Sequence, residues 1–150
     1  MARLSDDAIK QGFSHPDVDV RFAVLFYFAD AFSPDPSVMP LAIETLERFG
    51  RTRAFRFMHP ISRLAQTEKT VRWAFEELKT QPSRTEDEQN YLGMLARLLV
   101  NADPTLIRPF EPELSSLPVL VRDYQTSLIR RIRYLAWDTD ALWRELETIC

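Results

Sequence analysis

The fold class follows from residues 14–32, which read SHPDVDVRFAVLFYFADAF. This segment begins at a polar turn, and we place Pro16 at the first helical position, where the missing N–H of proline is tolerated. From Val18 to Phe32 the side chains are apolar almost all round, and the charged exceptions are Asp19, Arg21 and Asp30. A helix of this kind is expected in the middle of a layer, packed on several sides.

Similar helix signals recur along the whole chain. Ser5 and Thr85 are placed to cap helices, the latter in a capping box with Glu88, and Gly50 is placed to end one. The dipeptide His59-Pro60 should kink or split the helix that contains it. We predict an all-α protein of nine helices, at about 6–13, 17–32, 37–49, 51–65, 67–80, 85–101, from 104 onward, 118–136 and 139–150.

These helices alternate between two classes. Those of the second class begin near residues 17, 51, 85 and 118, which gives spacings of 34, 34 and 33 residues. A repeat of this length built from two helices is typical of an α-solenoid.

One motif carries a resemblance to a known family. The stretch Pro16-Asp17-Val18-Asp19-Val20-Arg21-Phe22-Ala23 resembles the start of the second helix of a HEAT repeat, and Pro118-Val119-Leu120-Val121-Arg122 is a weaker match. The resemblance to HEAT and HEAT-like (armadillo-like) repeats implies a right-handed α-α superhelix of about four helix pairs plus a terminal helix. It also implies binding of macromolecules. We expect residues 1–150 to form a single repeat domain, and the unpaired ninth helix favours a fragment or the N-terminal part of a longer chain.

Composition excludes several classes of function. With 3 Gly in 150 residues, P-loops and Rossmann fingerprints are absent, and the single cysteine, Cys150, leaves no internal disulfide framework or cysteine-rich zinc site. His15 and His59 each precede a proline, which favours turn or capping roles. We therefore expect no enzyme activity, no catalytic residues, no metal and no cofactor. The longest apolar run, 22–29, is too short to span a bilayer, and no signal peptide is recognisable, so we expect a cytoplasmic protein.

Charge is the feature that points to a binding surface. The second-class helices sum to +3 and the first-class helices to −6, within a chain of net charge −3. In HEAT-like solenoids the second helices line the concave face, so the resemblance implies a basic inner face. The candidate binding residues on it are Arg53, Arg56, Arg63, Arg130 and Arg133, with the aromatic residues Tyr91 and Tyr124.

Two interpretations of these arginines stay open. They either face an anionic partner, or pair with acids of neighbouring repeats, with Arg21 and Arg122 as the leading members of such a ladder. For function we predict a non-catalytic scaffold that binds another protein or an acidic peptide, with no membrane contact. The alternative implied by the resemblance is a nucleic-acid-binding or glycosylase-type repair protein with an arginine-rich groove. A compact helical bundle without a groove is a third hypothesis.

Overall fold

A computed structural model describes residues 3–117, 144 and 146–149, and over these residues the regular elements are all helices. The prediction of an all-α protein is confirmed for this part of the chain. Besides a short helical stretch within 144–149, the elements are α1 (Asp6–Lys10), η1 (Gln11–Ser14), α2 (Val18–Asp30), α3 (Val38–Phe49), η2 (His59–Arg63), α4 (Glu68–Thr80), α5 (Glu86–Asn101), α6 (Pro104–Ile107) and η3 (Arg108–Ser116), where η denotes a 3-10 helix. Most of the predicted segments 118–136 and 139–150 lies outside the described residues.

Local capping chemistry sets most helix ends. Ser5 accepts a hydrogen bond from the amide of Ala8 at the start of α1. Thr67 and Thr85 each take part in a capping box, the second one with Glu88, as predicted. Helix α3 ends at Gly50, whose φ of 102° lies in the region that favours glycine. One detail differs from prediction, because α2 begins at Val18 with Asp17 as its cap, so Pro16 precedes the helix.

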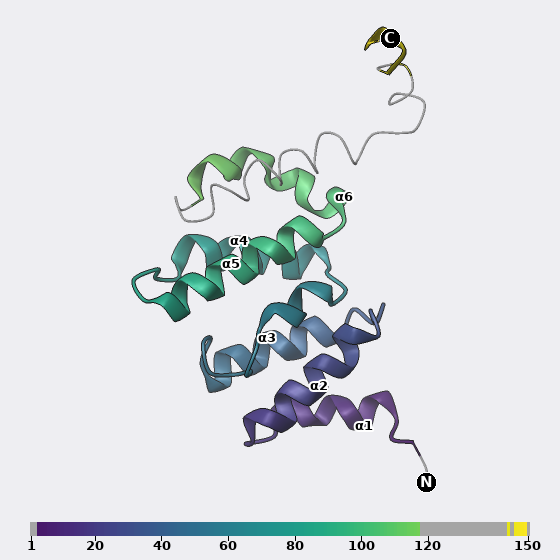
Figure 1. Cartoon of the computed structure of the whole chain (residues 1–150), viewed down its shortest axis with the longest axis vertical. Coiled ribbons are helices and arrows are strands. Elements are labelled where there is room, and N and C mark those ends of the chain that lie inside the picture. The colour runs from purple at the N-terminus through teal and green to yellow at the C-terminus, as the bar shows by residue number, and fades with distance from the viewer. Residues whose placement is uncertain (1–2, 118–143, 145, 150) are drawn as a thin grey trace.

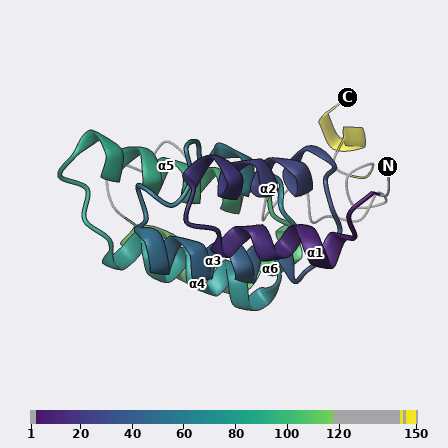
Figure 2. The same cartoon turned by 90° about the horizontal axis from the view of Figure 1, so that it is seen from below.

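The helices form two layers (Figures 1 and 2). Figure 2 shows α2 and α5 in one layer and α1, α3, α4 and α6 in the other. Along the longest axis of the molecule, α1, α2 and α3 follow one another, α4 and α5 lie next at about the same height, and α6 comes last (Figure 1). The 3-10 helix η2 packs against both α2 and α5 and therefore lies between them. A continuous set of buried apolar side chains, from Phe13 to Leu117, fills the interior.

The predicted helix 51–65 is wrong. Residues 51–56 form turns, and only His59–Arg63 is helical, as a short 3-10 helix. Pro60 limits any helix here to about two turns, which is marginal. In addition, the carbonyls of Arg53 and Ala54, which an α-helix would use for amides four residues ahead, accept hydrogen bonds from the Arg21 side chain. Local and long-range causes thus both oppose the helix.

Helix α2 is less enclosed than its composition predicts. Leu25, Phe28 and Ala29 are fully buried, which agrees with a central position in the layer. On another side of the helix, however, Phe26 remains 43% exposed and Phe22 is only partly buried. This aromatic side of α2 is therefore open to solvent.

The contact between η1 and α2 depends on a glycine. A Cβ at Gly12 would lie 2.5 Å from Cγ2 of Val24, a buried and stiff side chain. We therefore predict that Gly12→Ala lowers the free energy of unfolding by about 1–3 kcal/mol through overpacking. Urea denaturation monitored by circular dichroism measures this loss, and the double variant Gly12→Ala/Val24→Ala should recover part of it. Unchanged stability of Gly12→Ala would contradict the close packing.

None of the helices within the described residues has the length and apolar character needed to cross a membrane.

Candidate functional site

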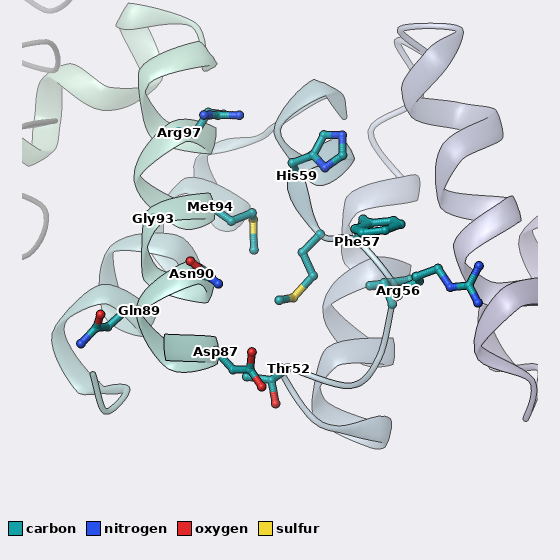
Figure 3. Close-up of a pocket in the computed structure, with 12 residues that line it drawn as sticks. Thr52, Arg56, Phe57, His59, Asp87, Gln89, Asn90, Gly93, Met94 and Arg97 are labelled. Atoms are coloured by element: carbon teal, nitrogen blue, oxygen red, sulfur yellow. The ribbon is translucent and has the colours of Figure 1, made fainter. Parts of the chain in front are cut away.

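A groove of about 410 Å³ opens between α5 and the segment 52–59. We call it the α5 groove (Figure 3). One wall comes from α5 and consists of Asp87, Gln89, Asn90, Gly93, Met94 and Arg97. The other wall comes from the irregular segment and consists of Thr52, Phe55, Arg56, Phe57, Met58 and His59. The groove therefore lies beside the segment where the sequence predicts a helix and the chain forms turns instead.

Helix α5 divides its residues between the core and this groove. Leu92, Leu95 and Leu99 are fully buried at three- and four-residue spacing, which is one face of a helix. Asp87, Asn90 and Arg97 are exposed and line the groove. The capping box at Thr85 fixes the start of α5 and, with it, the direction of both faces.

The two ends of the groove carry opposite charge. Arg97 is exposed, and its side chain has no hydrogen bond or ion pair within the described part of the chain. His59 lies across from it at the same end of the groove, whereas Asp87 lies beside Thr52 at the other end (Figure 3). Asp87 and Arg97 are ten positions apart, so about 15 Å of helix separates them. The groove thus offers an unpaired cation at one end and an acid at the other.

Aromatic side chains connect the groove to α2. The rings of Phe22 and Phe26 are 6.0 Å apart, those of Phe22 and Phe57 are 5.6 Å apart, and Phe57 and His59 are 6.4 Å apart. Phe57 is 55% exposed, although it contacts Phe22. We call these four residues the aromatic strip. An exposed row of aromatic rings beside a groove is typical of an interaction surface.

Two of the predicted arginines have acidic partners on α2. Nε of Arg56 lies 3.4 Å from Asp19, and Nη1 of Arg63 lies 3.8 Å from Asp30. Both arginines therefore lie near acids of another helix, which favours pairing over a surface left free for an anionic partner. The pairs are long, and at least one side chain in each is largely exposed, so each adds little to stability.

The other predicted site residues do not come together. Arg53 is exposed and lies outside the groove, and its side chain has no partner among the described residues. Tyr91 is 2% exposed and its hydroxyl donates to Glu77, so its prediction as a binding residue on an exposed face is wrong. Arg130, Arg133 and Tyr124 lie outside the described residues.

Arg21 is buried as a ladder residue would be, but its partners are backbone carbonyls. Its guanidinium donates to the carbonyls of Ala54 at 2.8 Å, of His15 and Pro16 at 2.9 Å each, and of Arg53 at 3.5 Å. It also lies 3.8 Å from the ring centroid of Phe49. Burial lowers the pKa of Arg21, yet a guanidinium stays protonated at neutral pH. Arg21 therefore joins two turns to α2 as a buried cation.

Glu77 is buried, although its neighbour Glu76 on α4 is exposed. Glu77 is 6% exposed and accepts two hydrogen bonds from Arg51, at 2.7 and 2.8 Å, and one from the hydroxyl of Tyr91 at 2.6 Å. The carboxylate raises the pKa of Arg51, and burial together with the bond to Glu77 raises the pKa of Tyr91. The helical stripe that Glu77 shares with Thr70 and Ala74, both buried, was the signal in the sequence.

Sequence reasoning identified only Arg56 among the groove residues. His59 was assigned a turn or capping role; it is the first residue of η2 and also lines the groove. His15 does act within a turn, since its Nδ1 accepts a hydrogen bond from the amide of Asp17. No group of three His, Cys, Asp or Glu side chains suited to a metal ion occurs within the described residues.

Protein-family models, curated proteins and solved structures were all compared with the chain, and none of them matches it.

Proposed function

We propose that the chain is a HEAT-like solenoid that acts as a non-catalytic binding module, and that the α5 groove holds a segment of a partner protein. The observation that carries the proposal is the groove itself, which opens between α5 and a segment that forms turns in place of a helix. Its volume of about 410 Å³ is that of a small ligand site, enough for a few residues of a peptide. The two-layer arrangement, with α2 beginning at Val18 and α5 at Glu86 in one layer, supports the solenoid assignment.

Protein is favoured over nucleic acid as the partner. Phosphate binding needs several free cations, and Arg56 and Arg63 already face Asp19 and Asp30. The candidate stacking residue Tyr91 is buried. The aromatic strip, with Phe57 at the edge of the groove, suits apolar side chains of a peptide or protein.

The test is selection of peptides on the purified protein. A random twelve-residue library displayed on phage is panned, and the enriched peptides are synthesised with a fluorophore for anisotropy titration. We expect dissociation constants in the micromolar range and at least a tenfold loss of affinity in Phe57→Ser/Arg97→Glu. The control is Arg84→Glu, an exposed arginine before α5, which should bind within twofold of the wild type.

Two results would contradict the proposal. One is the absence of any enriched peptide, or peptides that bind the groove variant as tightly as the wild type. The other is binding of a labelled DNA duplex that weakens steeply with salt and is lost in Phe57→Ser/Arg97→Glu, which would replace the protein partner by nucleic acid.

A further inference from the structure

Gly93 occupies the middle of α5 with no internal reason to be glycine. Within the part of the chain that the structure describes, a Cβ at Gly93 would meet no atom within 4 Å, and the φ of Gly93 is not positive. The two other glycines differ, since Gly12 is crowded by Val24 and Gly50 has a φ of 102°. Glycine weakens the interior of a helix relative to alanine, and it is used where another backbone approaches closely. The chain therefore has a destabilising residue at a position that the free protein does not require.

Gly93, which lowers the stability of the helix, lies in the wall of the α5 groove. Gly93 lines the α5 groove, between Asn90 and Arg97 on the same helical stripe. With no side chain there, a strip of helix backbone is open to the groove. Asn90, on one side of this opening, offers both a donor and an acceptor. Arg97, on the other side, offers a guanidinium that has no partner among the described residues.

We propose that an extended, acidic segment of the partner runs along the α5 groove and contacts the helix backbone at Gly93, with one carboxylate on Arg97 and an apolar side chain against Phe57 and Met94. This inference rests on the binding function proposed above. An extended chain fits better than a helix. A helix with its side chains is about 10–12 Å wide, so a single helical turn would take up about as much space as the whole groove, whose volume is about 410 Å³. The contact with bare helix backbone at Gly93 also requires a thin ligand.

Charge sets the polarity of the bound segment. Arg97 binds a carboxylate through two parallel hydrogen bonds, whereas Asp87 at the opposite end repels one. About 15 Å separates these ends along α5, a span of about five residues of extended chain. The carboxylate is therefore expected at one end of the bound segment, with neutral or basic residues toward Asp87.

The experiment uses the peptides enriched on the wild type and two glycine variants. Gly93→Ala should raise the melting temperature by about 2–4 °C, because alanine favours the helix, and yet weaken peptide binding at least threefold. Gly93→Leu should abolish binding, with at least a thirtyfold loss. Lys69→Leu, which places the same side chain on an exposed position of α4, is the control and should bind within twofold. Circular dichroism establishes that each variant is folded.

The peptides themselves test the charge contact. Each Asp or Glu of a peptide is replaced in turn by Asn or Gln. At one position this change should lower the affinity for the wild-type protein at least tenfold, but lower the affinity for the Arg97→Gln protein less than threefold. Arg84→Gln should retain the full tenfold effect.

The outcomes separate this inference from the proposed function. Binding lost in Phe57→Ser/Arg97→Glu but unchanged in Gly93→Leu would overturn the backbone contact at Gly93 and leave the binding function standing. If Phe57→Ser/Arg97→Glu and Gly93→Leu both bind the peptides as tightly as the wild type, the proposed function and this inference are both overturned. Enriched peptides without a carboxylate would overturn the acidic partner, and a dimer in light scattering that Gly93→Leu dissociates would make a second copy of the chain the occupant.

Discussion

Replacing Arg21 by methionine is expected to lower the free energy of unfolding by about 3 kcal/mol, because buried backbone carbonyls would lose their donor. Methionine keeps most of the apolar stem and removes the guanidinium. The carbonyl of Ala54, a fully buried residue, would have no replacement for the 2.8 Å bond from Nε. The carbonyls of His15 and Pro16 belong to exposed residues and recover water, so the Ala54 carbonyl contributes most of the loss.

Lysine should not replace Arg21. A single ammonium cannot reach the carbonyls of two separate turns at once, whereas the guanidinium fork does. We expect Arg21→Lys to recover less than half of the free energy of unfolding that Arg21→Met loses. Arg84→Met, which removes an exposed arginine, is the matched control and should change stability by less than about 0.5 kcal/mol.

Urea denaturation gives the free energies, and hydrogen exchange locates the change. The amide of Ala54 donates to Gly50 at 2.8 Å in the turn that Arg21 holds, so its exchange should accelerate more than that of amides in α4. A loss below about 1 kcal/mol for Arg21→Met would mean that water replaces the guanidinium at these carbonyls.

Local signals predicted the helices well, and the reason is physical. A cap such as Thr85 with Glu88, or a glycine such as Gly50, acts on backbone groups within four residues. The residues that determine a helix end are therefore neighbours in the sequence, where a local pattern reveals them. The prediction of a helix over residues 51–58 was wrong partly because the carbonyls of Arg53 and Ala54 bond to Arg21, more than 30 positions earlier in the chain. A pattern of neighbouring residues cannot show that the distant Arg21 side chain competes with helix amides for these carbonyls.

The candidate site was predicted only in part, for a similar reason. Counting charges found the basic segment that contains Arg56 and Arg63, but their pairing with Asp19 and Asp30 depends on the packing of the segment against α2. The charge count did not identify Arg97, because acidic residues of the same helix outweigh its charge. Its side chain nevertheless has no partner in the described part of the chain. Gly93 carried a signal in the sequence, a glycine inside an otherwise strong helix.

Replacing Glu77 by glutamine is expected to lower the free energy of unfolding by about 2–3 kcal/mol. Removing one partner of a buried ion pair generally costs about 3–5 kcal/mol, and the value is smaller here because Arg51 is about one-third exposed and can turn toward water. Tyr91→Phe removes only the hydroxyl that donates to Glu77 and should cost about 1.5 kcal/mol.

A double-mutant cycle tests whether Arg51 and Glu77 act as a unit. Arg51→Met and Glu77→Gln together should cost at least 1 kcal/mol less than the sum of the single variants, because each single variant leaves one charged or polar group without its partner. The control cycle uses Glu68 and Arg72, whose side chains are mostly exposed and 3.6 Å apart, and its coupling should stay below about 0.5 kcal/mol. Equal coupling in the two cycles would show that the Arg51–Glu77 pair behaves as a surface pair.

The same variant also tests how the groove is held together. Arg51 directly precedes the wall formed by residues 52–59, and Tyr91 belongs to α5, the opposite wall; Glu77 on α4 bonds to both. Loss of the carboxylate should therefore loosen the spacing of the walls as well as the core. We expect Glu77→Gln to weaken groove-binding peptides at least threefold at a temperature where the variant remains folded. Glu76→Gln, one position earlier on the exposed side of α4, should leave both stability and peptide affinity unchanged.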